Sequence, residues 1–269
     1  MAYLELPDGL PLYYEDHGSG PAVVLLHGWT MNSTFWQQNV AALSAQNRVI
    51  TLDLRGHGLS GKTDGGHTLA QYARDVHHLM QHLELRDVCL VGWSMGTAVI
   101  LSYVQQFGCG SLRSAAFIDQ SPRFLDAADW QYPLFGEYTA VDLAVFAQGF
   151  QHARPSVVKP FIAACFAETP PPEVIDAVYA ETAKTPTSAA LAVWYDMAHA
   201  DLRPVLPEVT VPTLLMYGAR SKVFPGDLDD WLAGQLPQAK IARFDGSGHA
   251  PFSEEPDSFN EVLGSFLRS

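Results

Sequence analysis

The chain has 269 residues, of which 48% are hydrophobic and 17% charged, and its formal net charge at pH 7 is −13. This composition is typical of a folded globular domain rather than of a disordered chain. The acidic balance, without any Lys/Arg cluster, argues against nucleic acid as a partner, because basic groups displace the counterions of nucleic acids. No apolar run is long enough to span a bilayer, so no membrane partner is expected either.

The N-terminus and the cysteines indicate a compartment. No basic region followed by an apolar stretch is seen at the start, so we expect no signal peptide. Cys89, Cys109 and Cys165 form no CxxC pair, which fits a reducing environment. Together these observations favour the cytoplasm, and they leave homo-oligomerisation open.

Short apolar runs alternate with amphipathic stretches along the chain. The short runs predict strands over 10–17, 22–27, 48–54, 87–92, 114–119, 212–218 and, as an edge strand, 240–244. Runs that are apolar throughout, such as 22–26, are typical of parallel strands covered on both faces. The amphipathic stretches predict helices over 68–85, 94–107 and 252–267. The expected fold is α/β, with a doubly wound, mostly parallel sheet of about eight strands.

The stretch 122–200 interrupts this alternation. It is rich in aromatic residues, is punctuated by prolines and has helical periodicity without a strand pattern. We therefore expect residues 1–121 and 201–269 to form the core and residues 122–200 to form a helical cap. Phe124 and Trp194 are candidates for lining a substrate pocket, although such aromatics can equally pack the cap onto the core.

The run Gly92-Trp93-Ser94-Met95-Gly96 matches the G-x-S-x-G pattern of a nucleophile elbow. An apolar run precedes it and a helical pattern follows it, which is the context that the motif requires. In such a turn the serine hydroxyl projects above the sheet, and the helix N-terminus favours a developing anion. The other interpretation is a serine that only caps a helix after a glycine turn.

A serine hydroxyl needs a general base, and His249 is the candidate, since it follows a predicted strand and a Gly-Ser-Gly turn. The loop after the strand that ends at His27 supplies the second oxyanion donor in elbow enzymes. We therefore assign the backbone N–H groups of Trp29 and Met95 to an oxyanion hole, and a structural role to His27. The histidines on the helix 68–85 are expected to be solvated, so no metal site is predicted.

Taken together, the landmarks resemble the α/β-hydrolase fold superfamily over nearly the whole chain. They are His27-Gly28-Trp29, the run from Asp53 to Ser60, the Ser94 elbow and Gly246-Ser247-Gly248-His249. The resemblance implies a triad in the order Ser, acid, His. Trp29 after the His-Gly pair and Met95 after the serine are similar to the residues at these positions in the arylesterase and cofactor-free haloperoxidase/perhydrolase branch. The resemblance also implies that the run after Asp53, with His57, braces the site.

The acid of the triad is where this chain departs from the family. The resemblance places an aspartate shortly after the strand 212–218, but Ser221 stands there, and a serine cannot stabilise an imidazolium by charge. Asp119 is our first candidate, because some relatives carry their acid at the end of this earlier strand. Asp227 is the alternative, although an aspartate at a helix start is a routine cap. A site without any acid stays open.

This constellation predicts a serine hydrolase that works through an acyl-enzyme and needs no cofactor. The substrate would be a small molecule of apolar character that carries an ester, lactone or thioester. Two alternatives in the same class are a perhydrolase or haloperoxidase-like enzyme and a C–C bond hydrolase. Because of Ser221, a ligand receptor of the same fold with little or no catalysis is the alternative from another class.

Overall fold

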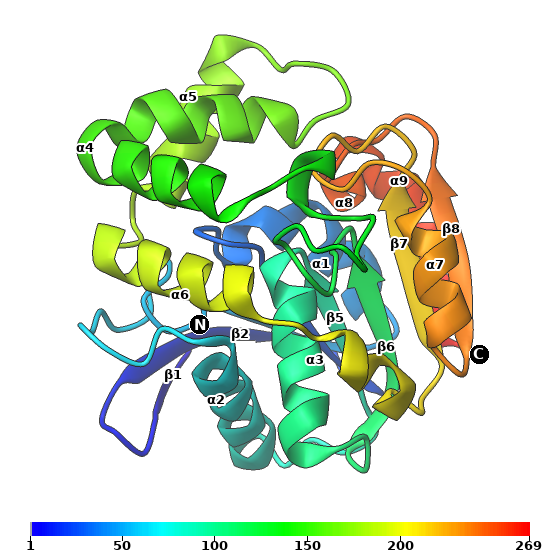
Figure 1. The fold of residues 1–269 in the computed structure, drawn as a ribbon. Coiled ribbons are helices and arrows are strands. Elements are labelled where there is room, and N and C mark those ends of the chain that lie inside the picture. The colour runs from blue at the N-terminus through cyan, green and yellow to red at the C-terminus, as the bar shows by residue number, and fades with distance from the viewer. Residues whose placement is uncertain (1) are drawn as a thin grey trace.

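The computed structural model describes residues 2–269, and its centre is one sheet of eight strands in the order β1-β2-β4-β3-β5-β6-β7-β8 (Figure 1). β1 pairs with β2, and β2 with β4, in antiparallel fashion; the other neighbours are parallel. The strands are β1 (Ala2–Glu5), β2 (Pro11–His17), β3 (Ala22–Leu26), β4 (Arg48–Leu52), β5 (Val88–Trp93), β6 (Leu112–Ile118), β7 (Thr213–Gly218) and β8 (Ala239–Phe244).

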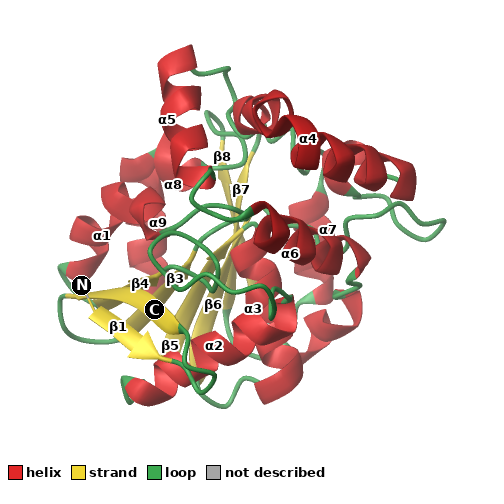
Figure 2. Ribbon diagram, turned by 90° about the vertical axis from the view of Figure 1, so that its left-hand side faces the viewer, coloured by secondary structure: helices red, strands yellow, loops and turns green. Residues whose placement is uncertain are grey.

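Helices cover both faces of this sheet, which confirms the doubly wound α/β fold. One face carries α1 (Gln37–Ser44), α8 (Pro251–Glu254) and α9 (Pro256–Leu267); the other carries α2 (Leu69–His82), α3 (Met95–Phe107) and α7 (Leu228–Gln235) (Figure 2). β3 is buried on both sides: Val24 and Leu26 join the core under α2 and α3, and Val23 and Leu25 join the core under α1 and α9. This double burial explains why the strand is apolar at every position.

Between β6 and β7 the chain leaves the sheet and forms the helical insertion, above the sheet in Figure 1. Its helices are α4 (Ala140–Ala164), α5 (Pro172–Thr182) and α6 (Thr187–His199). A capping box between Thr139 and Asp142 starts α4, and a kink at Ala153 (φ −145°, ψ 47°) precedes Pro155, whose ring cannot continue a regular helix. In the part of the chain described, no helix has the length and apolar character needed to cross a membrane.

Several details differ from the sequence-based expectation. The short edge strand β1 and the helix α1 were not predicted, and the predicted helix 252–267 is two helices, α8 and α9. The break lies at Glu255 (φ −129°, ψ 58°), because the residue before Pro256 is pushed out of the helical region. Short 3-10 helices, also unpredicted, span Ser33–Trp36, Leu134–Gly136 and Arg203–Glu208. The prediction that β8 lies at an edge is confirmed.

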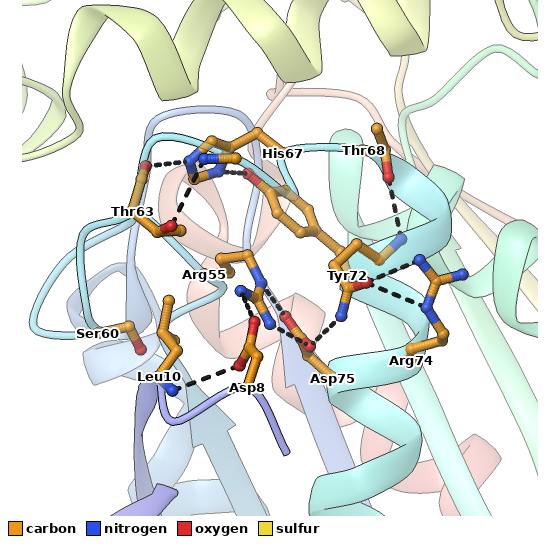
Figure 3. Close-up of polar contacts among 12 residues, drawn as sticks. Asp8, Leu10, Arg55, Ser60, Thr63, His67, Thr68, Tyr72, Arg74 and Asp75 are labelled. Atoms are coloured by element: carbon orange, nitrogen blue, oxygen red, sulfur yellow. Dashed lines mark hydrogen bonds and ion pairs between the residues drawn. The ribbon is translucent and has the colours of Figure 1, made fainter. Parts of the chain in front are cut away.

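A buried ion pair holds the loop after β4 (Figure 3). The Arg55 side chain is 3% exposed, and its Nε and Nη2 donate to the two carboxylate oxygens of Asp75 on α2 at 2.8 and 2.9 Å. Its Nη1 donates to Asp8, in the turn between β1 and β2, at 2.5 Å. In the same loop, the carboxylate of Asp53 accepts the N–H of Ser33 at 2.7 Å. The loop therefore braces the carboxyl ends of β3 and β4.

We expect Asp75→Asn to destabilise the protein by about 3 kcal/mol, because it leaves the buried Arg55 charge with Asp8 as its remaining partner, and the Asp8 side chain is 53% exposed. The measurement is the free energy of unfolding in urea. Asp16→Asn is the matched control: it removes an ion pair with Arg48 whose side chains are 31–32% exposed, and such pairs contribute about 0–1 kcal/mol. Equal losses in the two variants would contradict a bracing role for Asp75.

Candidate active site

Five residues that the sequence singles out follow the carboxyl ends of parallel strands. Trp29 follows β3, Ser94 follows β5, Asp119 follows β6, Ser221 follows β7 and His249 follows β8. Parallel strands end at the same edge of a sheet, which is where open α/β sheets bind their ligands. In this chain the helical insertion lies over that edge (Figure 1).

Ser94 lies in a strained turn between β5 and α3. Its backbone has φ 52° and ψ −119°, a region that residues with a side chain rarely adopt, and its N–H donates to the carbonyl of Ile118 at 2.9 Å. A Cβ atom at Gly92 would lie 2.4 Å from the main chain of Gly96, and one at Gly96 would lie 2.3 Å from the Leu26 carbonyl oxygen. The turn therefore requires glycine at both positions of the motif.

His249 is 2% exposed, and its loop is fixed on two sides. Its N–H donates to the carbonyl of Cys165 at the end of α4, and its carbonyl accepts the indole N–H of Trp93, both at 2.8 Å. The carboxylate of Glu254 accepts the N–H of Gly248 at 2.8 Å. These contacts hold the imidazole at the sheet edge and tie its loop to both the elbow strand and the insertion.

Asp119 is fully buried against His249. Its Oδ1 lies 3.3 Å from Nδ1 of His249, longer than a well-formed N–H···O bond, and the Ser221 hydroxyl donates to the same oxygen at 3.2 Å. Burial raises the pKa of Asp119 above its ordinary value, and the contacts with His249 and Ser221 oppose that shift. The residue that stands where the family carries its acid thus supports a carboxylate on the neighbouring strand.

Asp227, the alternative acid, lies elsewhere. It is exposed at the N-cap position of α7. There its carboxylate lies beside the Tyr132 hydroxyl, and the partial burial of that hydroxyl together with the Asp227 carboxylate raises the pKa of Tyr132. No hydrogen bond or ion pair within residues 2–269 joins Asp227 to His249. The structure therefore brings Asp119, and not Asp227, to the imidazole.

The main-chain N–H groups of Trp29 and Met95 are free donors near Ser94. Within residues 2–269 neither takes part in a hydrogen bond, and Met95 is the first residue of α3, where helical N–H groups have no intrahelical acceptor. The expected structural role of His27 agrees with its contacts. Its Nε2 accepts the N–H of Leu54 at 3.0 Å, so Nδ1 carries the proton and donates to the Gly28 carbonyl at 2.8 Å. Burial lowers the pKa of His27, which keeps the ring neutral.

An apolar cavity adjoins Ser94 and His249. Phe124 and Trp194, the pocket residues suggested by the sequence, both line it, and their ring centroids are 5.6 Å apart. Trp29 packs on Trp194 with centroids 4.5 Å apart. The remaining lining residues are Gly28, Met31, Trp93, Leu134, Phe161, Cys165, Val223 and Phe224. Apart from the imidazole, no titratable group except the Cys165 thiol faces this space, so it suits an uncharged, apolar group.

Sequence reasoning missed several of these residues. Met31 and Phe224 lie a few positions beyond the ends of β3 and β7. Their position after a strand end is the one sequence signal that could have indicated them. Nothing in the local pattern distinguishes Glu254 from an ordinary surface carboxylate. On α2, His78 and His82 have the spacing of two ligands on one helical face, but the described residues contain no cluster of three His, Cys, Asp or Glu able to hold a metal ion.

Asp119→Asn should make the fold more stable at neutral pH. A raised pKa in the folded state means that folding favours the protonated acid, so wild-type stability falls as pH rises from 3.8, the ordinary value, through the folded-state pKa. The amide has no charge to bury. In urea unfolding we expect the variant to exceed wild type at pH 7 and to lose that advantage near pH 4. Asp227→Asn, at an exposed carboxylate, is the control without such a trend. A variant less stable than wild type at pH 7 would contradict this account of Asp119.

Comparisons with known proteins identify the family of this chain. A model of the alpha/beta hydrolase fold family matches residues 21–256. A putative non-heme chloroperoxidase of Synechocystis sp. is 30% identical over 96% of this chain and 95% of its own length. A pimeloyl-[acyl-carrier protein] methyl ester esterase of Vibrio atlanticus is 30% identical over 96% and 98%. The crystallised esterase of Exiguobacterium antarcticum superposes with a TM-score of 0.92 at 27% identity, covering 100% of this chain and 99% of its own. The chain belongs to the alpha/beta hydrolase fold family.

Proposed function

We propose that this protein is a serine hydrolase that cleaves carboxylic esters through an acyl-enzyme. The observation that carries the proposal is that Ser94, in its strained elbow, and His249, backed by buried Asp119, line the same apolar cavity. Among the similar proteins, one is named a methyl ester esterase and another an esterase, which supports ester bonds as the target.

The mechanism follows from the chemistry of each group. The hydroxyl of Ser94 attacks the ester carbonyl while His249 takes its proton and then passes it to the leaving alcohol. Asp119, at Nδ1, holds the reactive tautomer and stabilises the imidazolium by its charge. The N–H groups of Trp29 and Met95 bind the oxyanion, each contributing about 3 kcal/mol to the barrier reduction. Water activated by His249 then hydrolyses the acyl-enzyme.

Perhydrolysis is a second candidate. It uses the same acyl-enzyme, but hydrogen peroxide takes the place of water and the product is a peracid. The similar protein of Synechocystis sp. is named a putative non-heme chloroperoxidase, and that name favours this reaction as a side activity of the same site. Peracid formation from a short ester and hydrogen peroxide, absent in Ser94→Ala, would support it.

A fluorophosphonate probe and p-nitrophenyl acetate test the nucleophile directly. We expect the probe to label Ser94 and the wild-type enzyme to release nitrophenol, because the elbow presents an activated hydroxyl. Ser94→Ala should do neither, which controls for reaction at other hydroxyls and at Cys165. Wild type that is neither labelled nor active would favour the receptor alternative instead.

Asp119→Asn should lower kcat for the same ester by about 10⁴, because the amide favours the wrong tautomer of His249 and removes the stabilising charge. The double variant Asp119→Asn/Ser221→Asp should recover a large part of this loss. The reason is that Ser221 Oγ and His249 Nδ1 both contact Asp119 Oδ1, so a carboxylate at 221 would lie close to the imidazole.

Asp227→Asn is the matched control for this series and should keep kcat within about twofold of wild type, since no contact joins Asp227 to the site. A loss of activity in Asp227→Asn comparable with that in Asp119→Asn would move the acid to position 227. If the double variant stays as inactive as Asp119→Asn, the carboxylate can act only from β6.

A further inference from the structure

A second apolar cavity, of about 120 Å³, lies beneath α5 and is not used by the mechanism above. Its walls include Ile162 of α4, Val174 and Val178 of α5, and Phe252 of α8. Ser253 is the one hydroxyl-bearing residue among those that line it, and none of them is charged. We refer to this space as the α5 cavity.

The α5 cavity adjoins the catalytic cavity. Met31, Trp93 and Cys165 line both spaces, so they form the partition between them. Trp93 is fixed by its indole hydrogen bond to the His249 carbonyl, and the Cys165 main chain by the His249 N–H. Met31 makes no side-chain hydrogen bond among the described residues, and an unbranched thioether chain changes rotamer readily. Met31 is therefore the part of the partition that can move aside.

The catalytic cavity is too small for a substrate by itself. It holds about 10 Å³, which is about the space of one water molecule. An ester that reacts at Ser94 must therefore place any longer chain outside it. The α5 cavity is the adjoining apolar space, and apolar cavities of about this size stay dry and bind ligands such as benzene.

We propose that the α5 cavity is a subsite for one unbranched, uncharged apolar chain of the ester, reached past Met31. This inference rests on the proposed esterase function. A chain that carried a carboxylate or phosphate would be buried there without an opposite charge, since no lining residue is charged and Ser253 carries the one hydroxyl among them. An apolar chain gains about fourfold in affinity for each methylene that it buries. The cavity thus selects chain length and excludes charged chains.

Val178→Trp tests the subsite by filling it. The readout is the ratio of kcat/KM for p-nitrophenyl hexanoate to that for p-nitrophenyl acetate, with a parallel ratio of hexyl acetate to methyl acetate. We expect at least a tenfold fall in one ratio, whereas Met31→Ala, which opens the partition, should raise the same ratio. A fall in the p-nitrophenyl ratio would place the acyl chain of the ester in the α5 cavity. A fall in the alkyl acetate ratio would place the chain of the leaving alcohol there.

Val141→Trp is the matched control, because it adds the same bulk on α4 where Val141 is 70% exposed, and it should leave both ratios unchanged. If Val178→Trp does not fold, Val174→Trp introduces the indole from the cavity wall at a residue that is 38% exposed. Unchanged ratios in both series with an active enzyme would overturn the subsite. Failure of wild type to hydrolyse any of the four esters would overturn the proposed function instead.

Discussion

The site depends on a carboxylate that is kept out of water at the carboxyl end of β6. Burial raises the pKa of Asp119, and the His249 ring, the Ser221 hydroxyl and the main chain of Gly218 oppose that shift. A carboxylate saturated with N–H donors would interact less strongly with an imidazolium that forms during a reaction. Its few polar partners therefore suit Asp119 to the role proposed for it, which is to stabilise the charge that would appear when His249 takes a proton.

The register of the sheet places this carboxylate close to Ser94. In the parallel pairing of β5 with β6, Trp93 lies opposite Ile118, so Ser94 and Asp119 are the first residues beyond a matched pair. The hydrogen bond from the Ser94 N–H to the Ile118 carbonyl fixes this offset at the point where both strands leave the sheet. A shift of one residue in either strand would turn Asp119 or Ser94, the proposed nucleophile, to the other face.

Those features that depend on local chemistry could be predicted from the sequence, and those that depend on distant contacts could not. The central strand β3, covered by helices on both faces, is apolar at every position, and the elbow needs glycine on both sides of Ser94. By contrast, the choice between Asp119 and Asp227 depends on which carboxylate reaches His249, more than a hundred positions from Asp119. β1 escaped prediction because its residues are only partly buried in alternation, which leaves a weak pattern. Glu254 accepts hydrogen bonds from the main-chain N–H groups of Ala167 and Gly248, and no pattern of side chains in the sequence indicates such contacts.

The insertion is bonded to the core at the site itself, so a movement of α4 or α6 changes the cavity and the proposed catalytic groups together. The indole of Trp29 donates to the Ala190 carbonyl on α6 at 2.8 Å, while its main chain offers the proposed oxyanion donor. On the other side of the cavity, the Cys165 carbonyl at the end of α4 holds the main chain of His249. A change of helix position that widens the cavity therefore also moves Trp29, the proposed oxyanion donor, or His249, the proposed base. Selection for a new substrate can avoid that coupling at Met31 or α5, which shape the second cavity without bonding to either group.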